Sequence, residues 1–383
     1  MKKILIVDDE VQILNALQRM FLDTDYEIIS TENSTDVMSL LEKGNIDMII
    51  SDMRMPELDG YKLLNDVKEK YPKIIRIILS GYADEKPMFR ALLHNVAKLY
   101  VFKPWNNNDF LNNINRLFAD EYELDTLKLN EKLEKIHCAS NVSENCKNMI
   151  TDIEDEDMEA LIGKIEEDSE ISKLLLQVAK SAVFGVMPDK VRQAAIYIGL
   201  HNLKSFMRFA CVVKTLKLIE SDEPHILCKH AYYTNRIFLF LFEAFLHKQP
   251  VESAMFAGLM HNIGLIILSN NSDDKEKVDQ SVPTLNEYAM LEHGKDELLH
   301  QELGAHFLDQ WDLPFPIYEA ALYHHRPLSH NIIHLELVSC IHIAQAYAWK
   351  ALGGEFEPVA KEVFDNIGVS VEDFETRLGR YMK

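Results

Sequence analysis

Short, nearly continuous apolar runs alternate with stretches of helical spacing along the first 120 residues. The apolar runs lie at residues 3–8, 26–30, 46–52, 74–80 and 98–102. Such runs are typical of parallel strands that are buried on both faces of a sheet. Helical spacing between the runs is seen in two sets, Val11, Leu14, Leu17 and Leu22, and Tyr61, Leu64 and Val67. The pattern predicts five βα units and a doubly wound α/β fold with a five-stranded parallel sheet.

From residue 145 to the end the pattern is helical throughout. Apolar residues recur with a period of 3.6 in 157–168, 171–185, 191–216 and 225–246, and prolines punctuate the sequence between helical stretches. No alternating strand pattern interrupts them. These features predict an all-α domain at 145–383.

The segment between the two domains has its own amphipathic pattern. Leu117, Leu124, Leu127, Leu133 and Ile136 fall near one face, with charges between them. We expect a helix over about 109–136, capped by Asn108 or Asp109, with a connector at 121–144 between domains at 1–120 and 145–383. Two interpretations remain open. The helix could carry rotation or homodimer pairing from one domain to the other, or it could be an exposed amphipathic helix.

Charge and composition narrow the classes of partner. The net charge of −21 over 383 residues disfavours binding to nucleic acid or an anionic membrane. The five cysteines show no zinc-like spacing and suit a reducing compartment. The apolar stretches 237–246 and 255–268 are too short and too interrupted to cross a bilayer, and the apolar run at the start ends at Asp8. We therefore expect a cytoplasmic protein without membrane insertion.

Polar residues stand at the ends of four of the five predicted strands. They are Asp8 and Asp9, Asp52, Ser80 and Lys103. In a doubly wound sheet, ligands bind beyond the carboxyl ends of the strands, so these side chains should converge. Clustered carboxylates favour a bound Mg²⁺, and one carboxylate can then act as a nucleophile. A phosphoryl group on Asp52 would have its charge met by the cation, Lys103 and Ser80.

Residues 1–120 resemble the receiver domain of bacterial two-component response regulators. The resemblance rests on Asp8-Asp9, Asp52 followed by Pro56 and Gly60, Ser80, and Tyr100 before Lys103-Pro104. It implies a flavodoxin-like fold, with Asp52 phosphorylated by a cognate sensor histidine kinase.

The same resemblance implies a magnesium site. Asp9 and Asp52 would bind Mg²⁺, with Asp8 assisting and the backbone carbonyl of Arg54 as a further ligand. The positions that it assigns to switching and to phosphoryl contacts are Ser80, Tyr100 and Lys103.

Histidines carry the candidate chemistry of the predicted helical domain. They are His230, His261, His300, His324 and His325, on four predicted helices. Helices that each contribute one ligand can build a metal site, although single helical histidines are more often core or surface residues. His324 and His325 should not both point at one centre, because helix neighbours lie about 100° apart. Gly258 and Gly264, which flank "LMHNI", predict a helix packed closely against a neighbour.

Residues 150–345 resemble the HDOD domain, a relative of HD-type metal phosphohydrolases found in bacterial signalling proteins. The segments that carry the resemblance are "LLLQVAKSAVFG", "AAIYIGLHNLKSF", "FAGLMHNIGLIIL", "HQELGAHFLDQWDLP" and "AALYHHRPLSH". Catalytic HD enzymes carry aspartates where this chain has Asn262 and Gln345. Neutral amides cannot bridge two cations, so the HD site is degenerate and hydrolysis is disfavoured. The Gly-Tyr-Pro segment of cyclic-dinucleotide phosphodiesterases is also missing after His325.

Two functions remain to be weighed. The favoured one is a phosphorylation-dependent response regulator that acts through a non-catalytic HDOD domain on a downstream protein partner. The alternative is a receiver-gated, metal-dependent phosphohydrolase acting on a nucleotide such as a cyclic dinucleotide. A DNA-binding regulator is disfavoured because the chain is acidic and has no recognisable basic recognition helix.

Overall fold

The protein divides into two compact units, residues Met1–Tyr122 and Glu123–Lys383, and each is described by itself. The computed structural model describes residues 1–56, 58–81, 95–123, 153, 156–181, 188–216, 226–269, 299–354 and 358–382. Within these ranges, no helix has both the length and the apolarity needed to cross a membrane.

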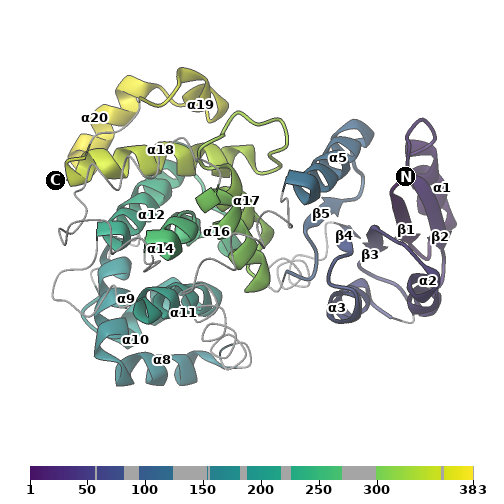
Figure 1. The fold of residues 1–383 in the computed structure, drawn as a ribbon, viewed down its shortest axis with the longest axis horizontal. Coiled ribbons are helices and arrows are strands. Elements are labelled where there is room, and N and C mark those ends of the chain that lie inside the picture. Colours follow the sequence, from purple (N-terminus) through teal and green to yellow (C-terminus); the bar gives the residue numbers. More distant parts are fainter. Residues whose placement is uncertain are drawn as a thin grey trace, which may run out of the picture. The chain divides into compact units, whose positions relative to one another are not determined.

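The N-terminal unit contains a five-stranded parallel sheet in the order β2-β1-β3-β4-β5 (Figure 1). The strands are β1 Lys3–Val7, β2 Glu27–Thr31, β3 Met48–Asp52, β4 Ile75–Ser80 and β5 Leu99–Phe102. Every neighbouring pair is parallel. All residues of β3 and β4 are buried, which explains their largely apolar sequences. The predicted α/β fold is confirmed.

Helices accompany the strands of this unit. They are α1 Val11–Met20, the 3₁₀ helix η1 Ser34–Asp36, α2 Val37–Lys43, α3 Gly60–Lys70 and α5 Asn107–Glu123. The helix expected between β4 and β5 falls on 82–94, outside the described residues. Leu22 was wrongly included in the helical spacing of the first helix, because α1 ends at Met20 and Leu22 is 75% exposed.

The start of α5 corrects the predicted helix cap. The side chain of Asn106, rather than that of Asn108 or Asp109, accepts hydrogen bonds from backbone amides of the first turn. These amides belong to Asn108 and Asp109, at 2.9 and 3.2 Å from Asn106 Oδ1. The rest of the predicted connector, from residue 124 to 144, lies outside the described residues. Its continuity as a helix stays a prediction.

The second unit is helical wherever the structure describes it, as the sequence pattern predicts (Figure 1). Its elements are α8 Met158–Glu167, α9 Ser169–Ser181, α10 Val191–Ile198, α11 Leu200–Thr215, α12 Ile226–Ala244, η2 Glu252–Ala254, α13 Ala257–Met260, α14 Ile263–Ser269, α16 Leu299–Gln310, α17 Phe315–Tyr323, α18 Leu335–Leu352, α19 Lys361–Asn366 and α20 Val371–Tyr381. The long helices α12 and α18 pack against each other.

Two glycines allow close helix packing beside His261, as the sequence predicts. A Cβ atom at Gly258 would overlap the backbone of Asn235 in α12. A Cβ atom at Gly264 would overlap the backbone carbonyl oxygen of His300 in α16. Backbone atoms in a helix cannot move aside as the end of a flexible side chain could. The glycines therefore let α13 and α14 approach α12 and α16 directly, which sets the position of His261 between them.

Candidate functional site

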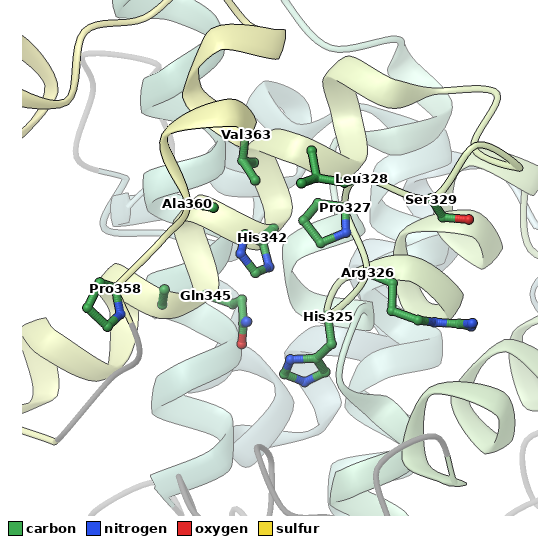
Figure 2. A pocket seen from close by; sticks show the side chains of 11 residues that line it. His325, Arg326, Pro327, Leu328, Ser329, His342, Gln345, Pro358, Ala360 and Val363 are labelled. Atoms are coloured by element: carbon green, nitrogen blue, oxygen red, sulfur yellow. The ribbon is translucent and has the colours of Figure 1, made fainter.

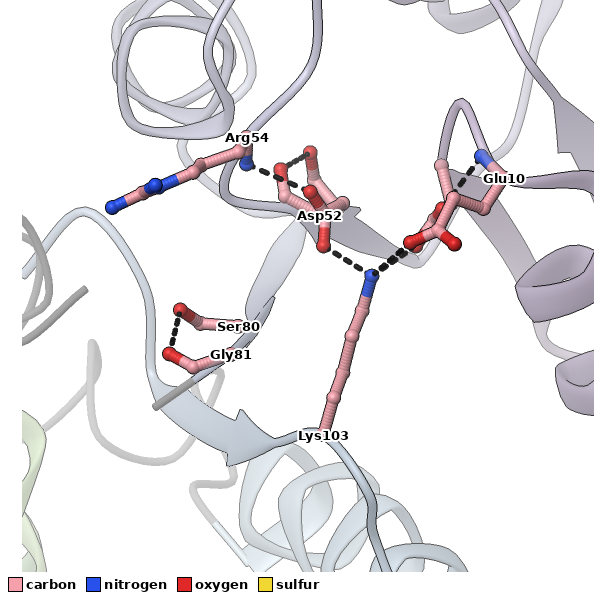
Figure 3. A network of polar contacts seen from close by, with 8 residues as sticks. Glu10, Asp52, Arg54, Ser80, Gly81 and Lys103 are labelled. Atoms are coloured by element: carbon pink, nitrogen blue, oxygen red, sulfur yellow. Dashed lines mark hydrogen bonds and ion pairs between the residues drawn. The ribbon is translucent and has the colours of Figure 1, made fainter. Parts of the chain in front are cut away.

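The ends of β1, β3 and β5 bring two carboxylates onto one ammonium group (Figure 3). Lys103 Nζ lies 2.8 Å from Asp8 Oδ2 and 2.5 Å from Asp52 Oδ1. Asp8 is fully buried and Asp52 is 6% exposed. Parallel strands end at the same edge of the sheet. Asp52 therefore becomes a neighbour of Asp8, 44 positions before it in the sequence, and of Lys103, 51 positions after it.

Burial and ion pairing compete within this group. Burial raises the pKa of Asp8, and the hydrogen bond from Lys103 opposes that effect without cancelling it. For Lys103, burial lowers the pKa, but hydrogen bonds to Asp52 and Asp8 raise it above its ordinary value overall. Lys103 is therefore a charged ammonium group at neutral pH.

The backbone fixes the orientation of Asp52. The amide of Arg54 donates to Asp52 Oδ2 at 2.7 Å, while Oδ1 faces Lys103. A Cβ atom at Gly60, the first residue of α3, would overlap the carbonyl oxygen of Asp52. Only glycine permits this approach, which explains the glycine eight residues after the aspartate.

Ser80 and Tyr100 lie on the neighbouring strands. The Ser80 hydroxyl, at the end of β4, donates to the carbonyl of Gly81 at 3.1 Å (Figure 3). Tyr100, in β5, is half-buried, and its ring meets that of Phe102 edge-on at 5.5 Å. Both residues are placed in the same part of the sheet as Asp52. Their movement on phosphorylation stays a prediction.

The donor atoms at this edge fit a magnesium ion. Asp8, Asp9 and Asp52 offer carboxylate oxygens, the ligands that Mg²⁺ prefers. Asp9 is exposed, which suits an ion that keeps several of its waters. The ammonium of Lys103 contacts both Asp8 and Asp52 at this edge. The role of the Arg54 carbonyl stays a prediction.

In the helical unit, three histidines form a compact group. The ligand atoms of His300, His324 and His325 all lie within 4.8 Å of one another. The expectation that His324 and His325 could not share a centre was wrong. Helix α17 ends at Tyr323, and the two imidazole rings just beyond it lie 4.2 Å apart. His324 still has helical backbone angles, so the side chains themselves bring the two rings together.

His261 and His230 lie beside this group with different surroundings. The His261 ring is 5.1 Å from that of His324, and its Nδ1 donates to the carbonyl of Gly258 at 2.8 Å. His230 stacks on Trp349 at 4.0 Å, and its Nε2 lies 3.0 Å from the backbone carbonyl oxygen of Gln345. His230 is therefore held by packing in the core between α12 and α18.

Asn262 and Gln345, the residues in place of the expected aspartates, are both buried. Gln345 also lines a pocket of about 350 Å³ together with His325 and His342 (Figure 2). All seven residues assigned to the degenerate HD site thus lie in the core of the helical unit or at this pocket.

Two polar arrangements of this unit were missed at the sequence level. The fully buried Glu319 accepts hydrogen bonds from the amides of Ile333 and His334 and contacts His334 Nδ1 at 2.7 Å. His342 Nδ1 lies 2.6 Å from the carbonyl oxygen of His324. A single acidic residue within the apolar run "FPIYEAALY" was the available signal for Glu319. His342, three residues before Gln345, shares its helix face.

Comparisons with known proteins divide the chain in the same way. Residues 4–115 match the family of response regulator receiver domains, and residues 138–327 match the HDOD domain family.

Individual relatives match the N-terminal part. The response regulator SaeR of Staphylococcus aureus is 32% identical over 119 residues, which are 31% of this chain and 51% of SaeR. The hydrogenase transcriptional regulatory protein HoxA of Cupriavidus necator is 33% identical over 102 residues, 27% of this chain and 21% of HoxA. The matches thus span about a fifth to a half of these relatives.

Among solved structures, the response regulator TrrA of Thermotoga maritima in complex with Mg²⁺ and BeF is similar. It is 28% identical, with a TM-score of 0.28, over 30% of this chain and 99% of TrrA. Receiver domains typically bind Mg²⁺, and the sheet edge offers oxygen donors for it. The chain therefore carries a response regulator receiver domain at residues 4–115 linked to an HDOD domain at residues 138–327.

Proposed function

We propose that this protein is a phosphorylation-dependent response regulator of a bacterial two-component system, with Asp52 as the phosphoryl acceptor. The observation that carries the proposal is the Lys103 ammonium, which touches both Asp52 Oδ1 and Asp8 Oδ2. This contact places a fixed positive charge beside the oxygen that would be phosphorylated. Such preorganised charge stabilises the charge that develops during phosphoryl transfer.

The transfer itself requires little movement of Asp52. With Oδ2 held by the Arg54 amide, Oδ1 is the oxygen left to attack the phosphorus. A P–O bond forms to Asp52, and the P–N bond to the kinase's phosphohistidine breaks, with the imidazole leaving. Lys103 can then exchange its contact with Asp52 for one with a phosphoryl oxygen, while it keeps Asp8.

The magnesium ion would be held by Asp8, Asp9 and Asp52, with the Arg54 carbonyl as a further ligand. When bound, it supplies positive charge to the transferred phosphoryl group and offsets the repulsion among the carboxylates. The residues of the chain supply the remaining contacts. We assign to Ser80 a contact with the phosphoryl group, which requires its hydroxyl to leave the Gly81 carbonyl.

We further propose that the HDOD domain is an interaction module rather than a hydrolase. A two-metal hydrolytic centre needs carboxylates that bridge the cations and help a bound water to ionise. Asn262 and Gln345 cannot supply them. The buried carboxylate of Glu319 is already committed to the segment at Ile333 and His334. A downstream protein partner is thus the expected recipient of the signal.

The partners follow from these assignments. A receiver domain implies a cognate histidine kinase that phosphorylates it. We propose no nucleic-acid partner, since the net charge is −21. We also propose that the chain can form a homodimer through the receiver or the connector, so that phosphorylation could change its oligomeric state.

The proposal is tested by small-angle scattering of the full chain with beryllofluoride and Mg²⁺, which together mimic the phosphorylated state. We expect a change in oligomeric state or domain arrangement in the wild type and none in Asp52→Ala. Asp66→Asn, which neutralises a half-buried residue of α3, is the matched control and should respond like the wild type. The same response in Asp52→Ala would refute the assignment.

A further inference from the structure

The buried histidines of the HDOD domain pose a question that phosphorylation at Asp52 does not answer. His324 is fully buried and His300 is 4% exposed, and their Nε2 atoms lie 3.3 Å apart. His325 completes a group whose ligand atoms lie within 4.8 Å. In this part of the structure, no carboxylate belongs to the group. The cluster is therefore one of nitrogen ligands alone.

Backbone carbonyls fix which nitrogen of two rings carries the lone pair. The His324 Nδ1 lies 2.8 Å from the carbonyl oxygen of Ala321, and the His261 Nδ1 lies 2.8 Å from that of Gly258. A carbonyl can only accept, so each Nδ1 is protonated and each Nε2 of the neutral ring is a lone-pair donor. This arrangement is the usual outer support of a metal-bound histidine.

A simple hydrogen bond between His300 and His324 is the competing explanation. It would account for two of the three rings in the group. The spacing also fits a metal, since two nitrogens bound at about 2.0–2.1 Å in a tetrahedral site stand about 3.3 Å apart.

We propose that His300, His324 and His325 bind a single Zn²⁺ ion in the HDOD domain. Three imidazoles are borderline ligands that suit Zn²⁺ and disfavour Mg²⁺ or Mn²⁺, which prefer oxygen. The amides Asn262 and Gln345 remove the bridging charge that a second ion would need. The site therefore differs from a two-metal hydrolytic centre in its ligands and in its ion number.

The pocket provides the route by which the ion enters. His325 and Gln345 both line it, and Figure 2 shows their side chains in the same part of the pocket. His325 is half-buried, whereas His300 and His324 are buried. An ion arriving through the pocket meets His325 first. The fourth coordination position is then available to a water molecule from the pocket.

The test uses the full chain, freed of metal by a chelator and with any affinity tag removed. Competition with a chromophoric chelator should show one Zn²⁺ per chain with a dissociation constant below about 10 μM. Cobalt substitution should give the visible spectrum of a tetrahedral ion with nitrogen ligands. A wild-type constant above 10 μM would overturn the proposal.

Variants locate the ion. His300→Gln and His324→Gln should weaken Zn²⁺ binding by at least about 100-fold. His306→Gln, on the same helix as His300, should bind as the wild type does. If circular dichroism shows that either buried variant does not fold, the half-buried His325→Gln gives the same test. Equal binding by ligand and control variants overturns the proposal, as does a near-ultraviolet thiolate–cobalt band, which would place the ion on cysteine.

Discussion

At the edge of the parallel sheet, Lys103 holds the carboxylates of Asp8 and Asp52 on one ammonium group. In the helical domain, the clustered polar groups are imidazoles, among them His300 and His324, and no carboxylate belongs to the described group. Both centres are largely buried. The first offsets burial with opposite charges, and the second is built from nitrogen ligands. The first centre is therefore suited to a Mg²⁺ ion together with a phosphoryl group, and the second to a single cation that accepts lone pairs from nitrogen.

The largest contrast between the two centres is in their response to pH. Burial lowers the pKa of His261 to about 4. Between pH 6.5 and 4, its imidazole is therefore protonated in the unfolded chain and neutral in the folded domain. The stability due to this residue is complete above pH 6.5 and is lost as the pH falls toward 4. At about 1.4 kcal/mol per pH unit, the loss is about 3 kcal/mol for His261 alone.

Urea unfolding at pH 7, 6 and 5 measures this effect, with a chelator present and with fluorescence from the buried Trp311 and Trp349. A Trp105→Phe background removes the signal of the receiver. His261→Gln should flatten the dependence on pH. The contribution of Asp8 to stability changes with pH in the opposite direction. Burial raises the pKa of Asp8, so its contribution to receiver stability is lost as the pH rises through that raised pKa. A helical domain equally stable at pH 7 and 5 would contradict the contrast.

The next effect concerns the ammonium at the receiver site. Lys103→Met should slow phosphoryl loading of Asp52 by about 100-fold, since it removes a preorganised charge beside the reacting oxygen. Time courses with the histidine kinase or a small phosphodonor measure this rate. Lys62→Met, which changes an exposed lysine of α3, is the control. Loading of Lys103→Met at the wild-type rate would show that the ion pair is structural only.

The smallest effect tests the packing that positions His261. Gly264→Ala should destabilise the helical domain by about 2 kcal/mol, because the added Cβ would overlap the His300 carbonyl. Gly163→Ala, in helix α8, meets nothing within 4 Å and should stabilise the domain by up to about 1 kcal/mol. Thermal unfolding of the two variants gives the comparison directly. Equal effects would mean that α14 can move away from α16.

The sheet and the charged residues at its edge were predictable because strand order and burial follow directly from the sequence. A short run dominated by isoleucine and leucine, such as Ile75–Ser80, has few alternatives to a buried strand. The approach of His324 to His325 was not predictable, since it depends on how the two side chains are turned at the end of α17. Helix ends depend on tertiary contacts and cannot be placed to one residue from spacing. The cap at Asn106 illustrates the same difficulty.

The buried role of Glu319 could not be predicted for a different reason. Its partners are the backbone amides of Ile333 and His334, 14 and 15 residues away in a connecting segment. Every residue type except proline carries a backbone N–H group, so the sequence does not show which amide will bind a side chain. Only the presence of a carboxylate in an apolar helix indicated that some partner must exist.

The central claim is that Asp52 is the residue that carries the signal into this protein. Intact-mass and peptide mass spectrometry of the full chain, treated with a small phosphodonor and Mg²⁺, tests it most directly. We predict one phosphoryl group per chain, located on Asp52 and absent from Asp52→Asn, with Asp66→Asn modified like the wild type. Incorporation into Asp52→Asn at the wild-type level, or a phosphoryl group located on another residue, would contradict the account.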